Sequence, residues 1–189
     1  MSFCMINRDQ TFQKINELIE NNNLVKHCLA VEAAMLWYAD YFKVSPSERI
    51  EWGIVGLIHD ADWEKYPSQH PRVIVEWLEQ QGASDAICNA VSAHGIDFGV
   101  EPKTLMAKTL RGVDELSGFI VAVTLVRESR RLSDVTVDSV LKKLKTSGFA
   151  KNINRDHISI GAEQLDIDLP QHISNTIDAM NAVSTELGL

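Results

Sequence analysis

The sequence has few cysteines, and their positions give no sign of a crosslinked or thiolate-bound structure. Only Cys4, Cys28 and Cys88 occur, and none belongs to a Cys-x-x-Cys pair. The odd count and wide spacing argue against a disulfide framework and against a cysteine zinc site, and they are typical of a protein from a reducing cytoplasm. A chain of 189 residues can bury a core without such crosslinks.

The chain also lacks a membrane-spanning stretch, a signal-peptide core and a dense basic run. No uninterrupted apolar segment approaches the roughly 20 residues that a membrane helix needs, and residues 1–9 have no apolar core. The formal net charge is −8. A long nucleic acid would be repelled by this charge, whereas a small anionic substrate is compatible with it if a bound metal supplies local positive charge. We therefore expect a cytoplasmic protein without membrane or nucleic-acid partners; homo-oligomer formation stays open.

No segment alternates apolar and polar residues for long enough to require a strand, and no internal repeat is present. Apolar residues instead recur at three- and four-residue steps, which predicts an all-α protein. A capping box at residues 45–48 opens one helix. Gly53 and Gly56 lie inside it, where each costs about 1 kcal/mol relative to alanine, so a close neighbour is expected there. Helices are predicted near residues 12–19, 24–38, 46–58, 71–81, 84–94, 104–131, 137–145, 155–165 and 170–187.

Four of the six histidines fall in the first half of the chain, each on a helix face or at a helix end. His27 shares the apolar face of its helix, and a buried structural histidine would explain it as well as a metal ligand. The His59-Asp60 pair closes an almost wholly apolar helix. Because burial of an unpaired carboxylate costs several kcal/mol, Asp60 should have a cation or a hydrogen-bond partner nearby.

Asp114 lies within the long predicted helix, although aspartate is a poor residue for a helix interior. A solvated aspartate or an ion pair with Arg111 would explain it as well as a metal ligand. Taken together, His27, His59, Asp60 and Asp114 supply two imidazoles and two carboxylates from three helices. That set forms a mixed nitrogen–oxygen site with coordination positions left open for water and substrate.

These residues and their order resemble the H…HD…D pattern of the HD-domain superfamily of metal-dependent phosphohydrolases. The resemblance covers roughly residues 24–126, and the chain after about residue 133 looks like the helical tail of a compact bacterial subgroup of predicted hydrolases. It implies one domain, 1–189, built as an HD-domain helical bundle with a C-terminal helical extension. The matching motifs are Leu24-Val25-Lys26-His27, Gly56-Leu57-Ile58-His59-Asp60 and Arg111-Gly112-Val113-Asp114-Glu115-Leu116.

The resemblance also implies the ligands. Superfamily branches with two metals carry two more histidines between the HD pair and the last aspartate, and His70 and His94 occupy such places; Asp60 would then bridge the ions. One ion and two ions both stay open, because His70 also fits a helix start and His94 also fits a cation at a helix end. The expected cofactor is one or two divalent transition metal ions (Mn, Fe, Ni, Co or Zn), with Mg as a further candidate.

The expected reaction is hydrolysis of a small phosphate ester, including a nucleotide monoester or diester, with His59 and Asp60 as the catalytic residues. A bound cation lowers the pKa of its water towards neutrality and offsets phosphoryl charge. Asp62 or Glu64 is a candidate to orient an imidazole or a water. The cations near the motifs are candidates to hold phosphate, although each would also suit a surface: Lys65, Arg72, Lys108 and Arg111.

Two other functions fit the same residues. Some HD-type sites hold two irons and carry out oxygenase reactions, so a di-iron oxygenase is one alternative. A non-catalytic helical module that binds a ligand is the other, although the complete ligand set favours an enzyme.

Overall fold

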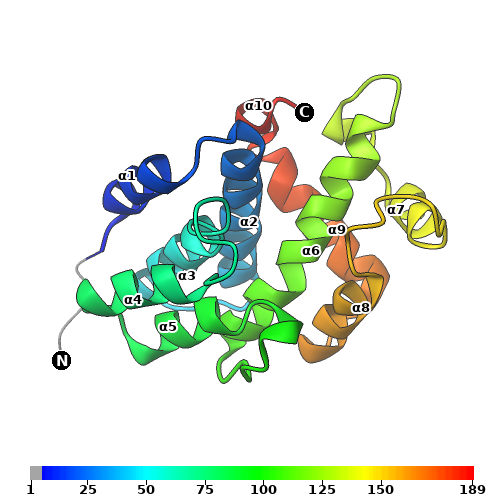
Figure 1. The fold of residues 1–189 in the computed structure, drawn as a ribbon. Helices are drawn as coiled ribbons and strands as arrows, with labels where there is room; N and C mark the ends of the chain where they lie inside the picture. Colours follow the sequence, from blue (N-terminus) through cyan, green and yellow to red (C-terminus); the bar gives the residue numbers. More distant parts are fainter. Residues whose placement is uncertain (1–5) are drawn as a thin grey trace.

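The computed structural model describes residues 6–189, and over that range the chain is helical with no strand (Figure 1). The predicted all-α class is therefore confirmed. The described helices are α1 (Arg8–Leu18), α2 (Asn22–Tyr41), α3 (Pro46–Ile58), α4 (Arg72–Gln80), α5 (Asp85–Ser92), the 3-10 helix η1 (Ile96–Phe98), α6 (Leu105–Leu125), η2 (Leu132–Asp134), α7 (Val137–Leu144), α8 (Arg155–Gln164), α9 (Leu169–Asn181) and α10 (Ser184–Leu187).

Two predicted helices extend well past the ends of the observed ones. The prediction over 104–131 is wrong at its end, because α6 stops at Leu125. Residues 127–131 are Arg-Glu-Ser-Arg-Arg and offer no apolar stripe that a further helical turn could bury. The prediction over 170–187 is wrong in its continuity. The chain leaves the helical conformation at Val183, and α10 then turns back onto α2, where Leu187 is buried.

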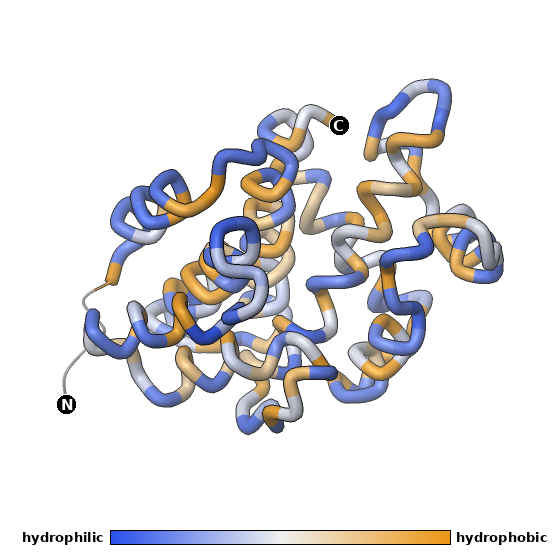
Figure 2. Tube along the Cα trace, viewed as in Figure 1, coloured by the Kyte–Doolittle hydropathy of each residue, from blue (hydrophilic) through white to orange (hydrophobic). Residues whose placement is uncertain are grey.

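α2 lies at the centre of the bundle and packs against α3, α6 and α9. Figure 2 shows hydrophobic positions following α2, α3 and α6, while the outer turns are mostly hydrophilic. Buried side chains of α2, α3, α5 and the first half of α6 form one apolar cluster. The second half of α6 forms another with α7, α8 and α9. Because α2 and α6 border both clusters, side chains on these two helices are held in fixed relative positions.

Glycines allow two of the helix crossings that position the site. A Cβ atom on Gly56 would lie 2.9 Å from the Cα of Glu32 and from the carbonyl oxygen of Val31. The close neighbour expected beside this glycine is therefore confirmed, and it is α2. A Cβ atom on Gly161 of α8 would lie 2.5 Å from the Cα of Gly112 in α6. α3 is thus pressed against α2, and α8 against α6.

Across residues 6–189, no helix combines the length and the apolarity that crossing a bilayer requires.

Candidate metal centre

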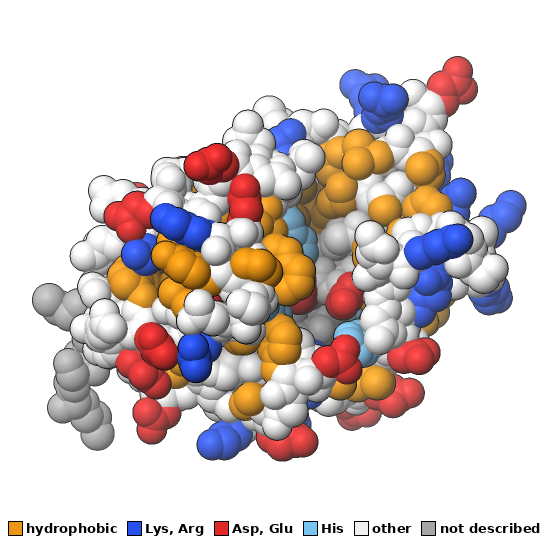
Figure 3. Space-filling view, viewed as in Figure 1, with side chains coloured by type: hydrophobic (Ala, Val, Ile, Leu, Met, Phe, Trp, Pro, Cys, Tyr) orange, Lys and Arg blue, Asp and Glu red, His pale blue; other side chains and the backbone are white. Residues whose placement is uncertain are grey.

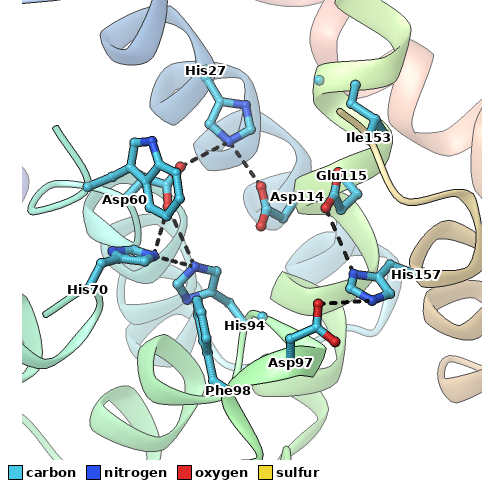
Figure 4. Close-up of a pocket in the computed structure, with 13 residues that line it drawn as sticks. His27, Asp60, His70, His94, Asp97, Phe98, Asp114, Glu115, Ile153 and His157 are labelled. Carbon is cyan, nitrogen blue, oxygen red and sulfur yellow. Dashed lines mark hydrogen bonds and ion pairs between the residues drawn. The ribbon is translucent and has the colours of Figure 1, made fainter. Parts of the chain in front are cut away.

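The structure brings the six predicted metal-binding residues together; Figure 4 shows five of them, and His59 lies next to Asp60 and Asp114. His27 comes from α2 and Asp114 from α6, while His59 and Asp60 directly follow the last residue of α3. His70 precedes α4 and His94 follows α5. All of them except His59 line one cavity of about 380 Å³, and His59 is fully buried.

Local hydrogen bonds fix the orientation of three of the four imidazoles. The Nδ1 atom of His59 lies 2.8 Å from the Gly56 carbonyl oxygen, and that of His94 lies 2.6 Å from the Val91 carbonyl oxygen. Nδ1 of His70 lies 2.6 Å from the carboxylate of Asp62. Because these oxygens only accept, each Nδ1 carries a hydrogen, so the neutral form of each ring has its free lone pair on Nε2. This is the tautomer that binds a metal through Nε2.

The carboxylate of Asp60 lies between two pairs of imidazoles. Its Oδ2 atom is 3.6 Å from Nε2 of His27 and 3.6 Å from Nε2 of His59. Its Oδ1 atom is 3.4 Å from Nε2 of His70 and 3.5 Å from Nε2 of His94. The two oxygens therefore divide the site into two groups that could each hold a cation, one with His27 and His59 and one with His70 and His94.

Asp114 adds a second carboxylate to the first of these groups. Its Oδ1 atom lies 3.0 Å from Nε2 of His27 and 3.5 Å from Nε2 of His59. The predicted ligand set of His27, His59, Asp60 and Asp114 is thus gathered at one end of the cavity, with the His70 and His94 pair beside it.

The donor atoms are arranged in a way that calls for positive charge between them. Nε2 of His59 is buried without a hydrogen-bond partner. Nε2 of His70 lies 3.1 Å from Nε2 of His94, although the Nδ1 contacts leave a lone pair on both. Two lone pairs at that distance repel each other unless a proton or a metal ion lies between them. The residues therefore fit a divalent cation at each group.

The pKa values show how strongly the cluster favours positive charge. Burial by itself would lower the pKa of His59, but the carboxylates of Asp60 and Asp114 outweigh it and raise that pKa to about 9. Burial opposes ionisation of both carboxyls, yet the facing imidazoles hold the pKa of Asp60 and of Asp114 below its ordinary value. Without a metal, protons would have to supply this charge.

Asp62 plays the part expected for a residue that orients an imidazole. It is fully buried, its Oδ1 atom accepts from His70, and its Oδ2 atom accepts from the backbone N–H of Ile74 at 3.0 Å. Glu64, the other candidate, turns away and accepts from the backbone N–H groups of Glu20 and Asn21.

The four cations predicted near the phosphate are not brought to the cavity. Arg111 is buried and donates to the carbonyl oxygens of Ala93 at 2.8 Å and Val100 at 2.7 Å. Arg72 is exposed beside Glu76, and neither Lys65 nor Lys108 lines the cavity. Indeed no Lys or Arg of the described chain is among the lining residues. Arg111 instead holds the backbone on both sides of His94.

The wall across from the metal ligands was not predicted from the sequence. His157 of α8 lies 3.8 Å from Oε1 of Glu115 and 3.9 Å from Oδ2 of Asp97. Burial, reinforced by the charge of Asp114, raises the pKa of Glu115 to about 7. The remaining lining is largely apolar, with the rings of Trp63 and Phe98 among it. The one sequence feature that could have indicated this side of the cavity is the position of Glu115, directly after Asp114.

Comparisons of the chain with protein-family models, with curated proteins and with solved structures found no match.

Proposed function

We propose that this protein is a metal-dependent phosphohydrolase of the HD-domain type that acts on a small phosphate ester. The observation that supports this most is the position of Asp60, whose two oxygens each face a separate pair of imidazole Nε2 atoms. A divalent ion at each of these groups would supply the charge stabilisation that in-line displacement at phosphorus requires.

His27, His59, Asp60 and Asp114 would hold one ion, and Asp60, His70 and His94 the other. Divalent ions there would lower the pKa of bound water and neutralise charge that builds on phosphoryl oxygens. His59 and Asp60 contribute to catalysis as ligands in this proposal. The first is buried behind the cavity, and the second shares its charge between the two groups.

The other residues that line the cavity would bind and enclose the substrate. The cavity of about 380 Å³ suits a small molecule, a nucleotide being one example. Since the lining residues include no Lys or Arg, neutralisation of the phosphate falls to the metal ions, and His157 can donate a hydrogen bond to it. Trp63 and Phe98 contribute aromatic faces that reduce access of bulk water to the reacting groups.

The test combines metal analysis with an activity screen. Protein stripped of metal is reloaded separately with Mn, Co, Ni, Zn, Fe and Mg and is assayed against phosphomonoesters and phosphodiesters, nucleotides included. We expect two ions per chain in the best case. Asp60→Ala should reduce metal content to less than one ion and activity by at least about 100-fold, because several kcal/mol of transition-state stabilisation depend on the ions.

Glu79→Gln, at an exposed position of α4, is the control and should match the wild type. A metal-loaded protein that hydrolyses none of the phosphate esters in the panel would contradict the proposal. Turnover that requires oxygen and an iron pair would instead assign the site to an oxygenase. Unchanged function in the Asp60→Ala protein would point to a module in which the metal is incidental.

A further inference from the structure

A second cavity adjoins the candidate metal centre. It measures about 320 Å³ and shares two lining residues, His27 and Gly118, with the metal cavity. Figure 3 shows a hollow along this face of the molecule, with hydrophobic side chains at its upper end and histidine and acidic side chains below. Four leucine or valine side chains dominate the second cavity: Val121, Leu125, Leu187 and Leu189.

The charge of the two cavities differs sharply. The metal cavity contains three carboxylates beyond Asp60, namely Asp97, Asp114 and Glu115. Among the described residues, the lining of the second cavity includes no Asp or Glu side chain, and Lys26 is its one lysine. Leu125 leaves 50% of its surface exposed at this face. We call this second cavity the apolar groove.

Gly118 lies where the two cavities meet, and neither its backbone nor its packing explains why it is glycine. It is within α6 and is not among the glycines with positive φ. A Cβ atom there would meet only the Cδ1 atom of Ile153, at an ordinary contact distance of 3.6 Å. Gly161, by contrast, has no room for a side chain. An interior glycine weakens a helix relative to alanine. The presence of glycine at position 118 therefore needs another explanation.

We propose that Gly118 keeps open a passage through which the substrate extends from the metal centre into the apolar groove. The substrate is then a phosphate ester with an alkyl or similarly apolar chain of several carbons. Its phosphate lies at the ligands, and its chain passes Gly118 to contact Val121 and Leu125. This inference rests on the proposed function for the phosphate end. Because the groove is continuous with the metal cavity, we assign it to the substrate and not to a second copy of this protein.

The test measures binding, so that it does not depend on turnover. Methyl-, butyl-, hexyl- and octylphosphonate are titrated by calorimetry into the full chain loaded with metal. Each buried methylene should lower Kd about twofold to fourfold until the groove is filled. Gly118→Leu should abolish this gain, so that within the variant Kd for octylphosphonate is no longer lower than Kd for methylphosphonate, because the added side chain fills the passage.

Gly148→Leu is the matched control, since a Cβ atom there has no neighbour within 4 Å and φ is not positive. It should retain the full dependence on chain length. Circular dichroism verifies that both variants are folded, and metal analysis verifies that they carry the wild-type number of ions. Should Gly118→Leu fail to fold, Val121→Asp provides the same comparison from the groove side, with loss of the chain-length gain again the expected result.

Equal Kd values for methyl- and octylphosphonate, or no binding by any member of the series, would overturn the inference. So would a flat series together with a dimer in sedimentation that Leu125→Asp dissociates, because the groove would then be a contact between copies. A chain-length gain in a protein that hydrolyses neither octyl phosphate nor other esters supports the groove and contradicts the proposed function. The two proposals can therefore fail separately.

Discussion

At the scale of single residues, the candidate site depends on groups that orient the imidazoles without belonging to the ligand set. The Nδ1 atoms of His59, His70 and His94 are each held by an acceptor, and in two cases that acceptor is a backbone carbonyl three residues earlier. Backbone carbonyls cannot be removed by substitution. Asp62 is the exception, because His70 depends on a side chain.

We predict that Asp62→Asn weakens binding of the ion assigned to His70 and His94 about 10- to 100-fold. A neutral amide cannot accept from both His70 and the Ile74 N–H, so one of the two donors loses its partner or the ring changes tautomer. Calorimetric metal titration should show one ion bound as in the wild type and the other bound weakly.

Glu64→Gln is the control, because Glu64 lies two positions away and binds only backbone N–H groups of residues 20 and 21. Two unchanged metal affinities in the Asp62→Asn protein would show that His70 is not oriented by this contact.

At the scale of helices, much could be predicted because local signals and apolar periodicity agree. Ser45 and Glu48 form the expected capping box at the start of α3. Helix ends were predicted less well. The end of α6 depends on the absence of anything for residues 127–131 to pack on, and a polar segment can form a surface helix or a turn with nearly equal ease.

The site shows the same division between local and long-range information. A His-Asp pair closing a buried helix indicates a site from nearby residues alone. The partners of Arg111 are backbone carbonyls of Ala93 and Val100, and nothing local in the sequence identifies them. His157 reaches the cavity because α8 crosses α6, so its place depends on a helix pairing that a pattern of apolar residues does not specify.

We predict that Gly161→Ala destabilises the protein by about 1–3 kcal/mol, the usual range for overpacking. The added Cβ would lie 2.5 Å from the Cα of Gly112, so α8 must move away from α6 and carry His157 with it. Urea unfolding followed by circular dichroism measures the loss. Gly148→Ala should change stability by less than about 0.5 kcal/mol, and an equal effect of both substitutions would contradict a close α6–α8 crossing.

At the scale of the whole molecule, the cluster links stability to pH. The folded-state pKa of His59 is about 9, above its ordinary value of 6.5. Its contribution to stability is therefore complete below pH 6.5 and is lost as pH rises through 9. The pKa values of Asp60 and Asp114 are lowered in the folded protein, so their contribution is present above about pH 4 and is lost in acid.

We predict that the metal-free protein stays folded but loses stability between pH 6.5 and 9, by on the order of 3 kcal/mol. Bound ions should reverse this trend, because they compete with protons for the same nitrogens. Thermal unfolding at pH 6 and pH 9, with and without metal, measures both effects. A metal-free melting temperature that does not change with pH would show that His59 is neutral in the cluster.

The position of Asp60 between the two groups has a further consequence for how the protein would acquire its ions. One carboxylate carries one negative charge, and the first cation to bind would neutralise most of that charge. The second cation would meet a weaker attraction and the repulsion of the first. The two ions would then bind with unequal affinity. At low metal concentration, part of the protein would hold only one ion.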